Sequence, residues 1–434
     1  MVNELICNSK LYNKNSPKFI INFFKLGPSC DIFHVNRDLV YKFNYLEKKK
    51  KILENEKLVN DGLTSSEKKK KRYSKYLDCS KKESKLLTSR PEQYNDKNYR
   101  KITLFNDEYL WIKKFQKKFH NEIVKSLPSS ELSYLQSTIK HVSYASNANA
   151  HKGKRYAFII DMENFFTQVN DDKVKMTLKK LLSLDNDIAE IYTKLLTSPC
   201  DEPPYHNNHY VIGQGLPSSP LMAFLCNSSF FDYLNQSCMA QDIKMTIYVD
   251  DIVFSSEKPI SQEFIDRLFT LFKKNDLSIN RKKCALVKND GIKKITGAFV
   301  TPYEVRVKNS KREEINIIYN KIIEIIKNLN DFKSYFDLYN LFLKFTGNFY
   351  HLAEVECKTN GKYSIPLQYS KYYHLIKLIE CYIPRGINKK NSKEIYNQEN
   401  IRKDEDMQKL NSAYQKLLFN KERICNNLER KNDK

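Results

Sequence analysis

The chain has 434 residues, and its 41% hydrophobic and 12% aromatic content excludes a disordered polypeptide and allows a large core. The formal net charge of +23 favours a polyanionic partner, most simply nucleic acid, although 61 Lys against 13 Arg also fits an AT-rich genome. The ten scattered cysteines contain no C-x-x-C pair, which argues against a zinc ribbon or a disulfide scaffold. This cysteine pattern fits a reducing cytosol, so we expect a cytoplasmic protein. No apolar run is long enough for a signal peptide or a membrane span, so we expect no membrane partner.

The first 86 residues are predicted to form a basic N-terminal extension. They contain two lysine-rich runs, "EKKKKILENEK" (47–57) and "EKKKKRYSKY" (67–76). Each run can be the solvated face of a helix or an arm that contacts phosphates, and both interpretations stay open. A short strand around "YRKITLF" then leads into an amphipathic helix, in which Trp111, Phe115 and Phe119 recur at a spacing of four. That spacing indicates core packing.

Strands and helices alternate in the central region. A strand over 155–161 is followed by two helices, for which Asp171 and Asp187 are the predicted N-caps. A glycine- and proline-rich loop, "GQGLPSSP" (213–220), leads into a further helix, and the run "TIYVDDIVFSS" predicts a β-hairpin. Beyond residue 310 the periodicity is mostly helical, and the charged last part of the chain carries no chemistry that the sequence reveals.

Three aspartates fall at the ends of these predicted strands. Asp250 and Asp251 alone are most simply a turn, and Asp161 alone is most simply a strand end or a helix cap. If the three carboxylates meet at one edge of a sheet, they repel one another unless cations lie among them. Two Mg²⁺ ions about 4 Å apart, or Mn²⁺ in their place, would relieve the repulsion and bind the attacking and leaving oxygens of a phosphoryl transfer.

The order of these elements resembles that of the reverse transcriptases. "YVDD" (248–251) is similar to their signature Y-x-D-D turn, "IIDMENFF" is similar to the strand that carries their first metal-binding aspartate, and "GQGLPSSP" resembles a loop near their template and nucleotide. The resemblance implies an α+β fold of the right-hand polymerase type, with fingers, a palm built on an antiparallel sheet, and a helical thumb. It also implies that Asp161, Asp250 and Asp251 are catalytic and bind the metal ions.

The same resemblance assigns candidate nucleotide-binding residues. Phe166, five residues after the first aspartate, matches the aromatic residue that blocks a ribose 2′-hydroxyl, although packing in the palm core is the alternative. Gln214 has both a donor and an acceptor for a base, a sugar or a phosphate. Arg100, and more weakly Lys97, are candidates for a triphosphate contact in the fingers, because a guanidinium can bond two phosphate oxygens. A surface arginine on a strand is the alternative for Arg100.

Two short elements resemble the retron reverse transcriptases of bacteria in particular. "NANAH", with Asn147 and His151, is similar to their N-A-x-x-H element, and "ITG", with Thr296 and Gly297, is similar to their V-T-G element. The phrase "FTGNFYHLAEVE" also resembles the retron thumb. The resemblance covers roughly residues 87–375, whereas the long N-terminal part and the C-terminal part have no matching segment.

The retron resemblance implies an RNA-directed DNA polymerase. It would use dNTPs to copy its own structured noncoding RNA into a short single-stranded DNA attached to RNA (msDNA), in antiviral defence beside a toxic effector protein. The alternatives are a reverse transcriptase of another bacterial defence system or of a group II intron, and a nucleic-acid-binding scaffold without activity. The predicted domains are an N-terminal extension (1–86), fingers (87–154), a palm with the catalytic carboxylates (155–309), a thumb (310–375) and a charged C-terminal tail (376–434).

Overall fold

A computed structural model describes most of the chain, in nine ranges: 2–27, 30–47, 86–88, 99–127, 130–200, 209–288, 291–359, 362–384 and 405–432. Lys97 and the two lysine-rich runs, apart from Glu47, lie outside the described residues. The chain divides into two compact units. Unit 1 consists of Met1–Val142 and Phe158–Leu286, and unit 2 consists of Ser143–Ala157 and Val287–Lys434. The boundaries proposed for fingers, palm and thumb remain predictions.

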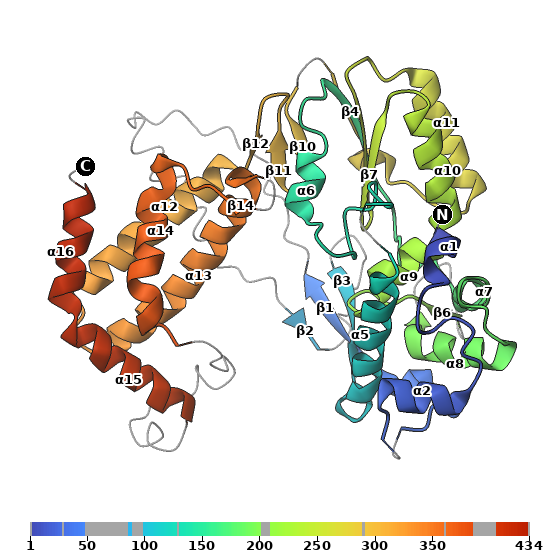
Figure 1. Cartoon of the computed structure of the whole chain (residues 1–434), viewed down its shortest axis with the longest axis horizontal. Coiled ribbons are helices and arrows are strands. Elements are labelled where there is room, and N and C mark those ends of the chain that lie inside the picture. The colour runs from blue at the N-terminus through green and yellow to red at the C-terminus, as the bar shows by residue number, and fades with distance from the viewer. Residues whose placement is uncertain are drawn as a thin grey trace. The chain divides into compact units, whose positions relative to one another are not determined.

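Unit 1 mixes helices with short sheets (Figure 1). Its helices are α1 (Val2–Ile6), α2 (Pro17–Phe24), α3 (Arg37–Val40), α5 (Leu110–Lys125), α7 (Asp171–Leu182), α8 (Asn186–Leu196), α9 (Ser219–Leu225), α10 (Ser228–Met239) and α11 (Gln262–Lys274). Its strands are β1 (Tyr41–Glu47), β2 (Leu86–Leu87), β3 (Tyr99–Phe105), β4 (Tyr156–Asp161), β5 (Ser198–Cys200), β6 (His209–Val211), β7 (Lys244–Tyr248), β8 (Asp251–Ser256) and β9 (Ala285–Val287).

The central sheet of unit 1 has the strand order β7-β8-β4-β9. Helix α10 packs against β7. Helices α10 and α11 both belong to unit 1 (Figure 1), and aromatic rings of α11 contact rings of β4 and β8. Phe269 of α11 lies 6.1 Å from Phe158 of β4 between ring centroids, and Phe264 lies 5.8 Å from Phe254 of β8. Burial of these apolar side chains stabilises the sheet and fixes the directions in which its strand ends point.

A second sheet in unit 1 joins the N-terminal segment to the predicted fingers strand. β1 pairs with β3 in antiparallel register from Tyr41 opposite Phe105 to Glu47 opposite Tyr99, and β2 lies on the other side of β1. The predicted aromatic core of α5 is confirmed for Phe115 and Phe119, which are buried and lie within 6 Å of the Tyr192 ring, whereas Trp111 is half-buried.

The two predicted aspartate caps are wrong. Helix α7 is capped by Asn170, which has extended backbone angles and whose side-chain oxygen accepts a hydrogen bond of 2.9 Å from the Lys173 backbone N–H. Asp171 is therefore already the first helical residue. Helix α8 begins at Asn186, so Asp185 holds the cap position and Asp187 lies in the first turn. Acidic residues there still interact favourably with the positive helix end.

Unit 2 is mostly helical (Figure 1). Its elements are α6 (Tyr144–Asn149), β10 (Lys293–Ile295), β11 (Ala298–Val300), β12 (Val305–Arg306), α12 (Asn309–Lys327), α13 (Phe332–Glu356), β13 (Lys358–Thr359), β14 (Lys362–Tyr363), α14 (Leu367–Ile379), α15 (Glu405–Phe419) and α16 (Lys421–Asn432). The predicted helix around "INIIYNKIIEIIKNL" is confirmed as α12, which buries Ile315, Ile318 and Ile322 on one face. Helices α15 and α16 pack against α12, α13 and α14, so the charged C-terminal region contributes to this core.

Among the residues that the structure describes, no helix combines the length and the apolar character that crossing a bilayer requires.

Candidate active site

The predicted hairpin forms, and its tip is a two-residue turn. Tyr248 of β7 pairs with Asp251 of β8, which leaves Val249 and Asp250 at the centre of the turn. Val249 has a φ of 58°, a conformation that a β-branched residue rarely adopts. Its backbone N–H donates a 3.0 Å hydrogen bond to the Ser137 hydroxyl, so a neighbouring segment holds the turn in this geometry. Backbone strain of this kind is concentrated at functional sites.

The first aspartate lies beside this turn. β4 ends at Asp161, and the next backbone N–H, of Met162, donates a 2.9 Å hydrogen bond to the Asp250 carbonyl. On its other side, the Asp161 carbonyl accepts a 2.9 Å hydrogen bond from the Asn280 N–H. The structure therefore brings Asp161 next to Asp250, although 88 residues separate them in the sequence.

The nearby cations do not fully compensate the Asp161 and Asp250 carboxylates. Burial raises the pKa of the Asp250 carboxyl, and the negative charge of Asp161 raises it further. The Asp250 backbone N–H, the Lys283 ammonium and the Arg100 guanidinium act in the opposite direction without cancelling the rise. Lys283 Nζ lies 2.9 Å from both carboxylate oxygens of Asp161. Two neighbouring carboxylates whose negative charge is not fully compensated attract cations.

The donor chemistry at this turn fits a hard divalent cation, because carboxylate oxygens are the ligands that Mg²⁺ and Mn²⁺ prefer. The Lys283 ammonium shows that the Asp161 carboxylate already accepts a cation. Within the described ranges, however, no three His, Cys, Asp or Glu side chains gather closely enough to hold a metal ion together. Lys283 occupies the Asp161 carboxylate in this arrangement, and metal binding by Asp161, Asp250 and Asp251 stays a prediction.

The glycine-rich loop packs tightly against β3. The Gln214 carbonyl accepts a 2.7 Å hydrogen bond from the Thr103 N–H, so the loop continues the β3 hydrogen bonding. A Cβ atom at Gly213 would lie 2.4 Å from the Ser198 hydroxyl oxygen, and Gly215 has a φ of 104°. Both positions therefore require glycine for a physical reason, close approach in one case and backbone angle in the other.

The candidate nucleotide-binding residues lie on these elements or shortly after them in the sequence. Gln214 is half-buried in the loop, and Phe166 is half-buried beside Phe165, with 5.9 Å between the ring centroids. Arg100 is exposed on β3, and its positive charge acts on Asp250. The triphosphate contact of Arg100 stays a prediction.

The family model described as "Reverse transcriptase (RNA-dependent DNA polymerase)" matches residues 81–337, more than half of the chain. The chain belongs to the reverse transcriptase family. This membership confirms the predicted α+β fold of the right-hand type. Reverse transcriptase domains generally use divalent metal ions, in agreement with the donor chemistry at the aspartate turn.

Three curated relatives of this reverse transcriptase come from retrons of Escherichia coli, in agreement with the predicted retron type. The chain is 28% identical to the retron Ec86 reverse transcriptase over 179 residues, covering 41% of this chain and 52% of the relative. It is 28% identical to the Ec83 enzyme over 114 residues (26% and 36%) and 27% identical to the Ec48 enzyme over 172 residues (38% of each). The matches thus span about half of these relatives or less.

Two solved structures are more distant. Telomerase from Candida albicans, in complex with a fragment of telomeric RNA, aligns with a TM-score of 0.38 and 9% identity, covering 66% of this chain and 56% of that chain. Apo telomerase from Candida tropicalis aligns with a TM-score of 0.37 and 11% identity, covering 49% and 53%.

The two retron-like elements of this reverse transcriptase lie together in unit 2, not at the aspartate turn. Thr296 and Gly297 form the turn between β10 and β11, and both have positive φ angles, 44° and 88°, as in a type I′ hairpin turn. The Thr296 hydroxyl donates a 2.8 Å hydrogen bond to the Tyr144 carbonyl at the start of α6, which carries Asn147. His151 follows α6 and is fully buried.

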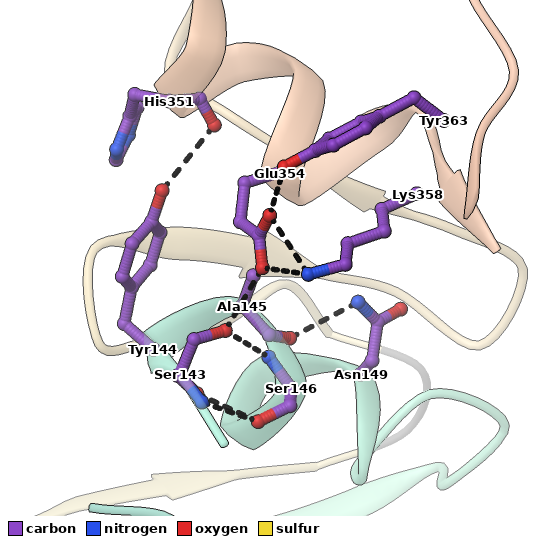
Figure 2. A network of polar contacts seen from close by, with 9 residues as sticks. All are labelled: Ser143, Tyr144, Ala145, Ser146, Asn149, His351, Glu354, Lys358 and Tyr363. Carbon is purple, nitrogen blue, oxygen red and sulfur yellow. Dashed lines mark hydrogen bonds and ion pairs between the residues drawn. The ribbon is translucent and has the colours of Figure 1, made fainter. Parts of the chain in front are cut away.

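Helix α6 is also attached to helix α13 (Figure 2). The Ser143 hydroxyl donates to Glu354 at 3.3 Å, the Tyr144 hydroxyl donates to the His351 carbonyl at 3.4 Å, and the Tyr144 and His351 rings stack. The Asn147 side chain is fully buried, and neither its nitrogen nor its oxygen has a hydrogen-bond partner among the described residues. The N-A-x-x-H element of this chain is thus a packing element between the β10–β11 turn and α13.

Sequence reasoning missed two groups of residues. Lys283 lies in the basic run "NRKKC", and nothing in that run distinguishes it from Lys282. The phrase "FTGNFYHLAEVE" was noted for its resemblance alone, yet it contains Glu354 and Glu356, which bind residues from several elements. Acidic residues within an otherwise apolar helix were the available signal, because a buried carboxylate needs partners.

Proposed function

We propose that this chain is an RNA-directed DNA polymerase of the retron type, with its catalytic centre at Asp161, Asp250 and Asp251. The observation that carries the proposal is the hydrogen bond from the Met162 N–H to the Asp250 carbonyl, which holds the end of β4 against the strained Y-x-D-D turn. Family membership supports the reaction class, and the unbalanced carboxylate charges support a role for metal ions.

Each residue of the candidate site has a separate role in the proposed nucleotide addition. Asp161, Asp250 and Asp251 would hold divalent ions, and such ions would supply a lower pKa for the primer hydroxyl and charge stabilisation for the leaving pyrophosphate. Lys283 neutralises Asp161 in the absence of an ion. Arg100 contacts the triphosphate from β3, and the Gln214 side chain contacts the nucleotide while its backbone carbonyl stays bonded to Thr103. Phe166 lies against the sugar and disfavours a 2′-hydroxyl.

The proposed biological role is taken from the resemblance to retron reverse transcriptases. The enzyme copies a cognate structured noncoding RNA into short single-stranded DNA that stays joined to RNA, and it acts in antiviral defence beside a toxic effector protein. The net charge of +23 supports a polyanionic partner of this kind. A group II intron enzyme or another defence enzyme would give DNA that is not branched from its own RNA.

The test is incorporation of labelled dNTPs on a primed RNA template with Mg²⁺, comparing Asp250→Asn with Asp242→Asn. Asp242 is exposed just before β7 at a φ of 56°, which asparagine tolerates, so it controls for a charge loss near the same hairpin. We expect Asp250→Asn to lower incorporation at least about 100-fold and Asp242→Asn to leave it unchanged. Equal activity of the two variants would refute the assignment of Asp250.

A further inference from the structure

Unit 2 contains a polar cavity that the polymerase chemistry does not use. It has a volume of about 340 Å³ and lies among the end of α6, strand β12, the C-terminal end of α13 and the start of α14. Four cationic side chains line it, namely Lys152, Arg306, Arg312 and Lys358. Two acidic residues, Glu304 and Glu356, also line it. The lining therefore carries two more positive than negative charges.

The more buried acid is fully occupied by internal donors. Glu356 Oε1 accepts from the Val307 N–H at 2.8 Å and from Arg312 Nε at 3.2 Å, and Oε2 accepts from Arg312 Nη2 at 2.7 Å and from the Tyr369 hydroxyl at 2.6 Å. Four donors leave this carboxylate little capacity to bind a further cation. Arg312 is thereby held in a fixed orientation, and its Nη1 has no partner among the described residues.

A second carboxylate, outside the lining, binds one of the lining cations, Lys358. Glu354, which Figure 2 shows between helix α6 and strand β14, accepts from the Ser143 hydroxyl, from Lys358 Nζ at 2.8 and 3.1 Å, and from the Tyr363 hydroxyl at 2.6 Å. This arrangement holds the Lys358 ammonium at the cavity. It also anchors α6, which carries Asn149 into the lining. Arg312 and Lys358 are thus positioned before any ligand binds.

The remaining two cations are more available. Lys152 is exposed and has no ionic partner within the described part of the chain, and Arg306 is about half exposed and pairs with Glu304, which is itself 40% exposed. An exposed ion pair of this kind is weak, so an incoming anion can compete for Arg306 at small cost. The amides of Asn149 and Gln368 add neutral hydrogen-bonding groups to the wall.

We propose that this cavity binds a phosphate group of RNA, with its ribose, through Lys152, Arg306, Arg312 and Lys358. A net positive, preorganised lining with two guanidinium groups matches a phosphate, which an arginine can bind through two oxygens. The volume is at the lower end of the range for small-ligand pockets, roughly 300 to 1,000 Å³, and so suits one nucleotide unit. The choice of RNA over another polyanion rests on the proposed function.

The test is binding of a fluorescein-labelled RNA hairpin to the full-length protein by anisotropy, in EDTA without nucleotides, over a series of KCl concentrations. The variant Lys152→Gln/Arg306→Gln is compared with Lys321→Gln/Arg423→Gln, which removes two exposed cations of α12 and α16 and gives the same net charge. We expect the cavity variant to bind the RNA about fivefold more weakly than this control at 0.1 M KCl. The slope of log binding constant against log KCl concentration should be shallower by about 1 to 2.

Two versions of the hairpin, with a 5′-phosphate and with a 5′-hydroxyl, distinguish the source of the phosphate. If the cavity variant loses the same affinity for both RNAs, the cavity binds an internal phosphodiester. If it loses affinity for the phosphorylated RNA alone, the cavity binds a terminal phosphate. Identical affinity and salt slope in the two double variants would overturn the proposal. So would unchanged RNA binding together with weaker binding of a polyglutamate peptide, because the cavity would then serve an acidic protein.

Incorporation on a primed template is measured with the same preparations. If the wild-type protein incorporates no nucleotide, the polymerase proposal fails, and the RNA titration still decides the cavity by itself. If incorporation is normal and the two double variants bind RNA equally, the cavity proposal alone fails.

Discussion

The aspartate turn of unit 1 and the cavity of unit 2 use carboxylates in opposite ways. Asp250 is half-buried beside Asp161 and its pKa is raised, and the Asp161 carboxylate has one exposed lysine as its counter-ion. The Glu356 side chain is only 7% exposed, but four donors surround its carboxylate and a guanidinium neutralises it. A carboxylate left short of partners is suited to bind cations, whereas a saturated carboxylate is suited to hold other groups in place.

The largest stability effect is expected from Glu356→Gln. The amide cannot accept all four hydrogen bonds and leaves the Arg312 charge without its counter-ion, so we expect a loss of about 3 kcal/mol. Denaturant unfolding monitored by circular dichroism measures this loss. Glu304→Gln, an exposed acid at the same cavity, is the control and should change stability by less than about 1 kcal/mol. Equal losses would mean that the donors around Glu356 do not anchor this region.

Lys283→Gln tests whether the Lys283 ammonium of unit 1 competes with a metal ion for the Asp161 carboxylate. Removal of the ammonium frees the Asp161 carboxylate, so we expect Mn²⁺ to bind about fivefold more tightly, a value typical of losing one exposed competing charge. Electron paramagnetic resonance of free Mn²⁺ measures the binding without reference to activity. Lys282→Gln, one residue away, is the matched control. Weaker Mn²⁺ binding in Lys283→Gln than in Lys282→Gln would show that Lys283 does not compete with the ion.

Val249→Gly tests whether the turn stores strain. Glycine adopts a φ of 58° without steric cost, and this gain outweighs its greater entropy in the unfolded chain, so we expect a stabilisation of about 1 kcal/mol. The midpoint of thermal unfolding measures it. Val253→Gly, in the buried part of the adjacent strand, should destabilise instead. A destabilised Val249→Gly would indicate that Ser137 and the neighbouring strands impose no strain on the turn.

The smallest effect concerns an ion pair of unit 2. Burial raises the pKa of Glu314, but a hydrogen bond from Lys344 and the charges of Lys311 and Lys344 outweigh it, so the pKa is lowered below 4.5. The stabilisation from Glu314 is therefore present above the unfolded pKa and is lost as the pH falls through the lower folded value. Glu314→Gln should lower stability by less than about 1 kcal/mol at pH 7 and by still less at pH 3. A pH-independent difference would contradict this account.

Local patterns in the sequence predicted the aspartate turn well. The two β-prone runs on either side of Asp250 and Asp251 specified a hairpin, and the apolar run before Asp161 specified a strand, because both signals involve adjacent residues. The cap of α7 was misplaced by one residue, since Asn170 and Asp171 are both good caps and only the backbone geometry selects Asn170.

Contacts between distant residues were not predictable in this way. Lys283 meets Asp161 across 122 residues, and Ser143 meets Glu354 across 211 residues. Nothing in the local sequence of either lysine or serine specifies such a partner. The family resemblance located the N-A-x-x-H and I-T-G elements, yet only the structure shows that the Thr296 hydroxyl joins them through the Tyr144 carbonyl.

The most direct test of the central claim is to sequence the nucleic acid that co-purifies with the wild-type protein and with an Asp250→Asn/Asp251→Asn variant. A retron-type polymerase predicts a discrete RNA covalently branched to short DNA in the wild-type sample, and the same RNA without DNA in the variant. RNA that lacks DNA in the wild-type sample, even after Mg²⁺ and dNTPs are supplied, would contradict the polymerase assignment.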